Sequence, residues 1–306
     1  MFDVVGLGCC CLDFLGVLPR LPELDEEIQL LETSQQGGGE VATALVALAR
    51  LGSSVTFIGK VGDDPIGNFI TEDFNRYGVD SKHLSIEPGR ISLSAFVLVD
   101  KQSGKRTILA GTKTTSDVDP DQIPVELIQQ AKFLHLDGSS RAAALQAACL
   151  ARKTGTPVVL DADVLAYDAQ IHELIEQTDI VIASQAFAEL FTNTQDVNRA
   201  MDTLLRHGPS TVVITLGDQG SLTESAGNRF HTTAFDVDVV DTTGAGDVFH
   251  GAFIHGMLQS WELAKVLEFA SAVAAIKCTQ LGGRQGIPSF QQTLNFLSQQ
   301  KTQFFD

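Results

Sequence analysis

The residues with the clearest chemistry form one short run, Asp-Thr-Thr-Gly-Ala-Gly-Asp, from Asp241 to Asp247. The preceding Phe235–Val240 alternates apolar and acidic residues, as a strand does, and the residues after the run are mostly apolar, as in a buried helix. Gly244 and Gly246 allow the backbone to approach a ligand closely, and a helix start offers unpaired N–H groups and a positive dipole end. The run therefore predicts a phosphate-binding site at a strand-to-helix turn.

Asp247, the last residue of the run, adds a carboxylate beside this predicted phosphate site. Phosphoryl transfer depends mainly on positioning and charge stabilisation, together with a residue that takes the proton of the acceptor hydroxyl. A carboxylate can take that proton, which indicates a phosphotransferase. An acidic residue in the first turn of a helix can also serve only as a cap, and the residues alone leave this alternative open.

Length and charge limit the classes of protein. The chain has 306 residues, enough for one large domain or one domain with a small appendage. Its formal net charge of −17 repels nucleic-acid phosphates and anionic membranes, so we expect neither as a partner. No apolar run approaches the roughly 20 residues of a membrane span, and the N-terminus lacks the basic start of a signal peptide. We therefore expect a cytoplasmic protein.

Neither the cysteines nor the histidines predict a metal site. Cys9, Cys10 and Cys11 are consecutive, and no pair of cysteines has the Cys-x-x-Cys spacing of a zinc or redox site. The histidines show no metal-ligand spacing with acidic or cysteine neighbours. We interpret His250 and His255 as packing or surface residues.

Strand-like and helix-like segments alternate along most of the chain. The expected strands are Phe2–Leu7, Val55–Ile58, Phe133–Leu136, Val158–Leu160, Ile180–Ile182 and Val212–Thr215. The expected helices are Val41–Leu51, a segment capped by Asp64 and ended by Gly78, Ala142–Lys153, Ile171–Glu176 and Val197–His207. This alternation predicts an α/β fold with a mostly parallel sheet covered on both faces.

Two stretches break the alternation. Cys11–Ser34 has little helical period, and Ser92–Leu109 alternates like two strands joined by a turn at Lys101–Lys105. We interpret Arg106 as part of that turn. The two stretches together predict a small β-rich subdomain inserted into the α/β body.

The run from Asp241 to Ala252 resembles the C-terminal signature of the ribokinase-like (PfkB) carbohydrate kinases. Four further blocks of that family occur in order along the chain: Gly37–Gly39, Gly59–Asp64 with Gly67, Thr215–Gly220, and Gly282–Pro288. The resemblance implies a single ribokinase-like domain over residues 1–306. Its fold would be a three-layer α/β/α sandwich with a mostly parallel central sheet. A small β-rich lid would be inserted at about 11–35 and 91–112.

The resemblance also implies roles for individual residues. Asp247 would be the catalytic base, and the backbone of Gly244, Ala245 and Gly246 would form the anion hole. The implied positions for sugar binding are Asp13, Gly38, Gly39, Glu40 and Thr43, those for nucleotide binding are Gly217, Gly220, Ala274, Cys278 and Gly283, and those near a monovalent cation are Asp241 and Thr243. ATP, Mg²⁺ and a monovalent cation such as K⁺ would be the cofactors, and the lid would form a homodimer.

The chain departs from the family pattern at two places. The family's Gly-Gly-Asn-x-x-Asn reads Gly38-Gly39-Glu40-Val41-Ala42-Thr43, so both asparagines are missing. The family's Asn-x-x-Glu, which places magnesium through water, is absent near residues 184–187. Asp161, Asp163 or Glu189 could order the metal instead.

The substrate is the least determined part of the prediction. The C-terminal half is most similar to the sulfofructose kinase subgroup, but an anionic sugar needs Arg or Lys at its charged end. The expected pocket is acidic at residues 24–27 and at Glu40, and Arg106, Lys113 and Arg141 are the candidate cations. We therefore expect a neutral ketose or pentose. The alternatives are sulfofructose or a sugar phosphate, a nucleoside, and a non-catalytic kinase-derived protein that binds sugar.

Overall fold

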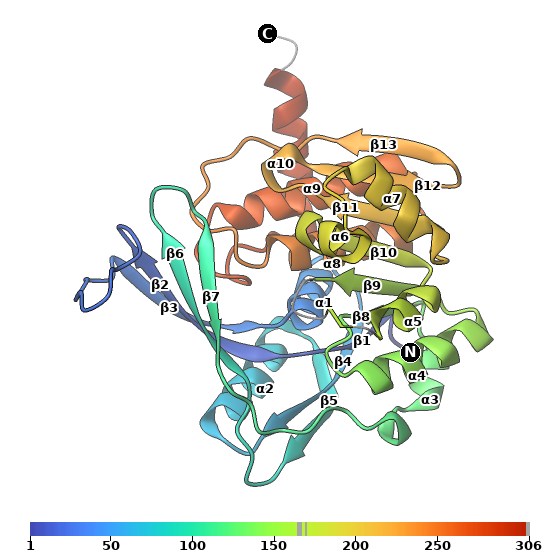
Figure 1. Cartoon of the computed structure of the whole chain (residues 1–306), viewed down its shortest axis with the longest axis horizontal. Coiled ribbons are helices and arrows are strands. Elements are labelled where there is room, and N and C mark those ends of the chain that lie inside the picture. Colours follow the sequence, from blue (N-terminus) through green and yellow to red (C-terminus); the bar gives the residue numbers. More distant parts are fainter. Residues whose placement is uncertain (164–166, 169, 304–306) are drawn as a thin grey trace.

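A nine-stranded sheet forms the centre of the computed structural model, which describes residues 1–163, 167–168 and 170–303 (Figure 1). The strand order is β13-β12-β11-β10-β9-β8-β1-β4-β5, with β12 and β13 antiparallel at one edge and the other seven strands parallel. The strands are β1 (Val4–Leu7), β4 (Val55–Gly62), β5 (Asp80–Glu87), β8 (Phe133–Leu136), β9 (Val158–Ala162), β10 (Ile180–Ser184), β11 (Thr211–Thr215), β12 (Ser221–Ser225) and β13 (Asn228–Thr232).

Helices cover both faces of this sheet. One face packs against α1 (Glu40–Arg50), α2 (Pro65–Tyr77), α8 (Ala245–Leu258) and α9 (Leu263–Cys278), with α10 (Phe290–Gln303) outside α9. The other face packs against α3 (Val125–Gln130), α4 (Arg141–Thr154), α5 (Ile171–Glu176), α6 (Gln185–Thr192) and α7 (Val197–Arg206). The described part of the chain also contains two short 3₁₀ turns, η1 (Pro120–Gln122) and η3 (Gly217–Gln219). The predicted three-layer α/β/α sandwich is confirmed.

Helix α2 illustrates how local sequence sets an element's limits. The side chain of Asp64 accepts a hydrogen bond from the amide of Gly67 at 2.8 Å, and Pro65 occupies the first helical position. Gly78 ends the helix with a φ of 77°, a left-handed conformation that glycine adopts at little cost. The sequence predicts both ends correctly.

Helices α1 and α8 approach each other at backbone distance. A Cβ atom at Gly251 would lie 2.4 Å from the carbonyl oxygen of Ala44, so the position must stay glycine. Both helices begin at the same edge of the sheet, α1 at Glu40 and α8 at Ala245. The close contact therefore fixes the two helix starts relative to each other.

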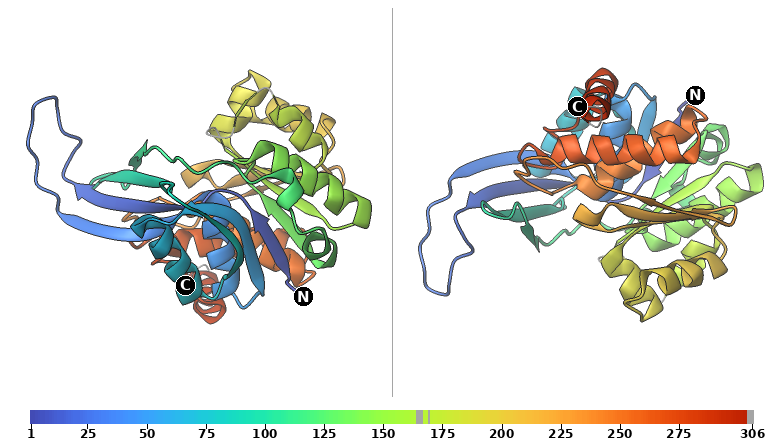
Figure 2. Two further views of the ribbon diagram at one scale, coloured as in Figure 1. Left: turned by 90° about the horizontal axis from the view of Figure 1, so that it is seen from below. Right: turned by 90° about the horizontal axis from the view of Figure 1, so that it is seen from above.

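A second sheet, which we call the lid sheet, projects from the body (Figure 2). Its strand order is β3-β2-β6-β7, from β2 (Cys11–Leu18), β3 (Glu32–Gly38), β6 (Ser94–Asp100) and β7 (Arg106–Ala110). The pair β2–β6 is parallel, and the other two pairs are antiparallel. The predicted hairpin over 101–105 is confirmed, but Arg106 belongs to β7 and not to the turn.

The expected strand at Phe235–Val240 is wrong. The segment has no strand partner among the described residues; the ring of Phe235 packs instead against that of Phe296 on α10, with the ring centroids 5.3 Å apart. The strands that precede it are β12 and β13, which end at Thr232. We call residues 241–247, which are predicted to bind phosphate, the phosphate turn. This turn therefore follows an irregular segment, whose end is held by hydrogen bonds from the N–H groups of Val240 and Asp241 to the carbonyl of Cys278.

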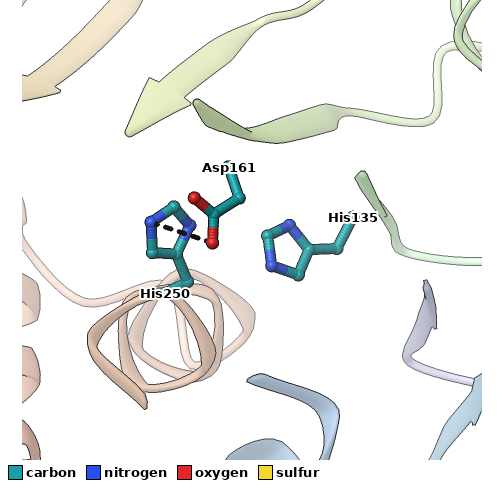
Figure 3. A group of neighbouring side chains, drawn as sticks. All are labelled: His135, Asp161 and His250. Atoms are coloured by element: carbon teal, nitrogen blue, oxygen red, sulfur yellow. Dashed lines mark ion pairs between the residues drawn. The ribbon is translucent and has the colours of Figure 1, made fainter. Parts of the chain in front are cut away.

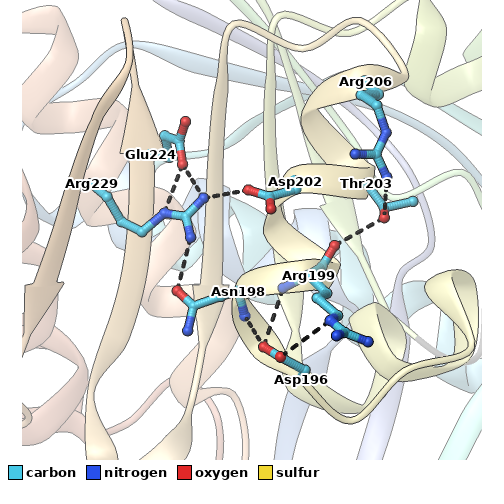
Figure 4. A network of polar contacts seen from close by, with 8 residues as sticks. All are labelled: Asp196, Asn198, Arg199, Asp202, Thr203, Arg206, Glu224 and Arg229. Atoms are coloured by element: carbon cyan, nitrogen blue, oxygen red, sulfur yellow. Dashed lines mark hydrogen bonds and ion pairs between the residues drawn. The ribbon is translucent and has the colours of Figure 1, made fainter.

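Arg229 ties the antiparallel edge of the sheet to the neighbouring helix (Figure 4). Its guanidinium on β13 bonds Glu224 on β12 at 2.7 Å, and Asn198 and Asp202 on α7 at 2.8 and 2.6 Å. This network fixes β12 and β13 against α7. No helix in the described part of the chain combines the length and apolar character of a membrane span.

Candidate active site

Acidic side chains gather at the carboxyl edge of the central strands. Asp137 directly follows β8, Glu40 opens α1, and Asp247 lies in the first turn of α8. In α/β sheets, ligands bind outside the carboxyl ends of the strands. The predicted catalytic and sugar-binding positions therefore meet at the edge where this fold class places its site.

The predicted anion hole is a tight turn at the start of α8. Gly244 has a φ of 73°, and a Cβ atom there would lie 2.8 Å from the Cα of Gly283. A Cβ atom on Gly246 would meet nothing within 4 Å, so the turn is open on that side. The Ala245 N–H donates to the carbonyl of Thr242 at 3.2 Å. The turn thus presents the helix start to open space, and Gly283 contacts it from behind.

Asp247 is half-buried, among other acids. Burial, followed by repulsion from Glu40, raises the pKa of Asp247 well above its usual value, while Arg106 acts in the opposite direction. Arg106 also donates to the hydroxyl of Thr242 at 3.2 Å, so a lid strand delivers a positive charge to the phosphate turn. A carboxylate with a raised pKa is a stronger proton acceptor when ionised.

Asp241 stabilises the turn through hydrogen bonds. Its carboxylate accepts bonds from the amide and hydroxyl of Thr243 at 2.8 and 2.7 Å and from the amide of Gly282 at 2.7 Å. Its carbonyl accepts a 2.8 Å bond from the ammonium of Lys277, which is fully buried and whose pKa is lowered by burial. Asp241 and Thr243, which are predicted to lie near a monovalent cation, are therefore hydrogen-bonded to each other, and the ammonium of Lys277 places a positive charge beside them.

Asp13 and the triple glycine, which are predicted to bind the sugar, lie together. A Cβ atom on Gly38 would lie 2.3 Å from the Asp13 carboxylate, so this glycine leaves room for the acid. Gly39 has a φ of 96° and packs against the carbonyl of Cys9. Asp13 accepts a 3.2 Å bond from the thiol of Cys11, and burial raises the pKa of Asp13. The structure brings these three predicted residues together.

Glu40 forms an acidic pair with Asp137. Its carboxylate accepts a 2.7 Å bond from the thiol of Cys9, whose amide donates to Asp137 at 2.8 Å. Burial and repulsion by Asp137 raise the pKa of Glu40 to about 7. The sequence did not single out Asp137, although its place directly after a predicted strand was the available signal.

Thr43, a predicted sugar-binding residue, has a hydrogen-bond partner within the protein. Its side chain is buried, and its hydroxyl lies 3.3 Å from the Nε of Arg284. Arg284 is itself buried, pairs with Asp73 at 2.6 Å, and donates to the carbonyl of Gly38 at 2.9 Å. Thr43 thus supports the glycine loop from behind. A charged residue contacting partners more than 200 positions away could not be anticipated from local sequence.

The predicted nucleotide residues lie on two segments. Cys278 and Gly283 contact the phosphate turn, and Ala274 lies one turn earlier on α9. Gly217 and Gly220 lie in the separate loop between β11 and β12, both with positive φ. A Cβ atom on Gly220 would lie 1.9 Å from the carbonyl of Thr232, so this loop requires glycine there.

A small pocket opens beside Cys9 and contains two lysines. The ammonium of Lys60 donates to the hydroxyl of Ser116 at 2.9 Å, and Lys113 pairs with Asp117 at 3.0 Å. Other lining residues are Cys10, Thr115, Ser139 and Ser140. Cations are therefore present near the acids, and the sequence did not single out Lys60 among them.

Comparisons with known proteins agree with this geometry. The model of the pfkB family carbohydrate kinases matches residues 1–289. Ribokinase from Haemophilus influenzae is 32% identical, over 85% of this chain and 87% of that protein. A 5-dehydro-2-deoxygluconokinase from Clostridium beijerinckii is 28% identical, over 99% of this chain and 95% of that protein.

Solved structures share the whole fold. A putative ribokinase from Agrobacterium tumefaciens superposes with a TM-score of 0.90 at 26% identity, covering 98% of this chain and 99% of that one. A putative Ribokinase II from E. coli in complex with ATP and Mg²⁺ gives a TM-score of 0.83 at 22% identity, covering 98% and 100%.

Proposed function

Because the chain belongs to the pfkB family of carbohydrate kinases, we propose that it phosphorylates a hydroxyl of a small sugar with ATP and that Asp247 is the general base. The observation that supports this most is the position of Asp247, in the first turn of α8 beside the open glycine turn. A base and an anion-binding helix start then face the same space. That is the minimum that phosphoryl transfer requires of a protein.

In this mechanism, Asp247 takes the proton of the sugar hydroxyl as its oxygen bonds to the γ-phosphorus of ATP. The bond between that phosphorus and the bridging oxygen breaks, and ADP leaves. Negative charge on the transferred phosphoryl group faces the start of α8, where Gly244, Ala245 and Gly246 present the helix backbone. Arg106, bonded to Thr242, adds positive charge on the same side.

Asp163 is the acid that we propose to hold Mg²⁺, directly or through water. Of the three candidates, Asp161 faces His250 at 3.5 Å, and Glu189 accepts a bond from Gln185 at 2.8 Å. Asp163 directly follows β9 at the carboxyl edge of the sheet, and its charge raises the pKa of Asp247. Mg²⁺ bound with ATP would supply positive charge that neutralises the phosphates and favours the ionised form of the base.

We propose that turnover does not depend on the monovalent cation that the family resemblance implies. The buried ammonium of Lys277 at the carbonyl of Asp241 favours a turn that is held without an added ion. We therefore expect turnover to change little when KCl is replaced by choline chloride. A strong dependence on K⁺ would show that Lys277 does not meet this need.

A neutral ketose or pentose is the substrate that we propose. Asp13, Glu40 and Asp137 surround the sugar side with carboxylates, which accept hydrogen bonds from hydroxyl groups and repel anions. The second candidate is an anionic sugar, such as a sugar acid. The lysines of the neighbouring pocket favour it, as does the name of the Clostridium relative.

Two experiments test these proposals. Asp247→Asn keeps the size of the side chain and should lower kcat by about 10²-fold or more while ATP binding persists. Near-normal turnover would contradict the role of the base. A panel of fructose, ribose, fructose 6-phosphate, sulfofructose, 5-dehydro-2-deoxygluconate and adenosine decides the substrate, with Lys60→Met and Lys113→Met as controls. Preference for an anionic member, lost in the lysine variants, would select the second candidate.

The lid sheet is also the surface that we propose for a homodimer. Phe96, Ile108 and Leu109 on β6 and β7 have exposed fractions of 52%, 45% and 53%, and the ring of Phe14 stacks on Phe96 at 5.2 Å. Burying such a patch against a second copy removes apolar surface from water. Sedimentation should give a dimer for the wild type and a monomer for Phe96→Asp; a monomeric wild type contradicts the proposal.

A further inference from the structure

Two histidines and one aspartate converge in the core beneath the candidate active site (Figure 3). His135 comes from β8, Asp161 from β9 and His250 from α8, so the cluster lies between the sheet and the helix. The exposed fractions of the three residues are 0%, 6% and 4%. One nitrogen of each imidazole and one carboxylate oxygen all lie within 4.8 Å of one another.

The hydrogen-bond partners within this cluster are incomplete. The Nδ1 of His135 lies 3.1 Å from the carbonyl oxygen of Val159; a carbonyl only accepts, so Nδ1 carries the proton and Nε2 keeps a lone pair. Within the described part of the chain, Nε2 of His135, Nδ1 of His250 and Oδ2 of Asp161 have no hydrogen-bond partner. Buried polar atoms without partners are rare, and two of them, Nε2 of His135 and Oδ2 of Asp161, point to a bound species.

We propose that His135, Asp161 and His250 bind a divalent first-row transition ion, represented by Zn²⁺. Imidazole nitrogens with one carboxylate are a known donor set for zinc, with a fourth position left for water. Tetrahedral ligands at about 2.0–2.1 Å from zinc lie about 3.4 Å apart. The Oδ2 of Asp161 and the Nε2 of His250 are 3.5 Å apart, which is too long for a good hydrogen bond and suits two ligands of one ion.

The second nitrogen of His135 supports the same assignment. Metal-binding histidines almost always donate their other N–H to a carboxylate or a backbone carbonyl, which fixes the ring and the tautomer. The bond from His135 to Val159 is of this kind. The donor set also separates this site from that of the nucleotide metal, because Mg²⁺ prefers oxygen ligands and imidazole suits transition ions.

The position suggests what the ion would do. His250 follows Asp247 by three residues on α8, so the ion would lie about one helical turn below the proposed base. A double positive charge there would favour the ionised carboxylate of Asp247. This consequence rests on the proposed function, whereas the metal site itself does not.

Metal binding can be measured without turnover. The full-length protein, stripped with a chelator, is titrated with Zn²⁺ in competition with a chromophoric chelator, and separately with Co²⁺ while the visible spectrum is recorded. We expect one ion per chain and the intense visible bands of four-coordinate Co²⁺. Loss of an outer partner of a zinc ligand costs about 10–100-fold in affinity, so His250→Gln should weaken binding at least about 100-fold.

Matched variants locate the ion. His255→Gln changes another buried histidine of the same helix, one that bonds Ser53 at 3.2 Å, and should bind Zn²⁺ like the wild type. His207→Gln alters a surface pair with His172 at 3.4 Å, and Cys9→Ser alters the acidic pair at Glu40; both should also leave binding unchanged. His135→Gln serves if His250→Gln does not fold.

The proposal fails under either of two results. The wild type takes up no stoichiometric Zn²⁺, in which case the cluster holds water or shares protons. The second result is that zinc affinity is lost in His207→Gln or Cys9→Ser and kept in the cluster variants, which would place the ion elsewhere. Neither result bears on the role of Asp247, because no readout uses turnover.

Discussion

Replacing Arg284 by Met should destabilise the protein strongly, because its guanidinium joins three parts of the chain in the core. The exposed fractions of the Arg284 and Asp73 side chains are 1% and 4%, and the two lie 2.6 Å apart. Removing Arg284 leaves Asp73 only the longer ion pair with the exposed Arg76, at 3.5 Å, and breaking a buried pair costs about 3–5 kcal/mol. At about 2 °C per kcal/mol for a chain of this size, the melting temperature should fall by about 6–10 °C.

The pairing itself is tested by a double-mutant cycle. Asp73→Leu alone should cost a similar amount, whereas Asp73→Leu combined with Arg284→Met removes both charges and should recover most of the loss. Arg284→Lys is the control for charge, because lysine keeps the charge and lacks the planar fork that reaches Gly38, Thr43 and Asp73 together. Thermal unfolding followed by circular dichroism gives all four values.

Two results would refute this reasoning. Single variants that each lose less than about 1 kcal/mol would show that the pair is solvated in solution. A double variant whose loss equals the sum of the single losses would show that the two residues act independently. Since Arg284 also holds the carbonyl of Gly38, the Michaelis constant for the sugar should rise more than that for ATP.

Three further predictions concern the site. Gly244→Ala should lower the free energy of unfolding by about 1–2 kcal/mol, because Gly244 has a left-handed backbone, and should also lower kcat because the new methyl group would meet Gly283. Gly78→Ala is the control: Gly78 has a similar φ and no such contact, so this variant should lose only stability. Asp13→Asn should raise the Michaelis constant for the sugar by about tenfold or more and leave that for ATP unchanged, as steady-state kinetics can measure. Because the pKa of Glu40 is raised from 4.5 to about 7, the stability that Glu40 contributes is present below pH 4.5 and is lost as the pH rises through about 7. The melting temperature of Glu40→Gln should therefore rise relative to that of the wild type across this pH interval. A constant difference would contradict the last prediction.

The features that sequence predicted well depend on neighbouring residues. The helix start at Pro65 and the end at Gly78 follow from capping rules, and the buried strands follow from short apolar runs. The glycine turn before Asp247 is likewise local, and its geometry agrees with the expectation. Such features can be predicted because the physical cause lies within a few positions of the residue.

The features that sequence missed depend on distant contacts. Phe235–Val240 has the alternation of a strand, but strand formation needs a neighbouring edge, and none in the described part pairs with it. Thr43 has the position of a sugar ligand, and its partner Arg284 lies 241 positions away. The histidines showed no metal-ligand spacing because His135 and His250 meet only when a strand and a helix pack together.

The backbone contact between α1 and α8 at Gly251 has a mechanical consequence. The two helices cannot approach each other more closely at this point, since Gly251 already packs against the carbonyl of Ala44. The minimum spacing between the sugar loop and the phosphate turn is then set before any ligand arrives. Movement of the lid sheet would also move Arg106, which lies on β7 and bonds Thr242 of the turn. Each swing of the lid would bring that charge to the reaction and remove it again, so product release and loss of catalytic charge are one movement.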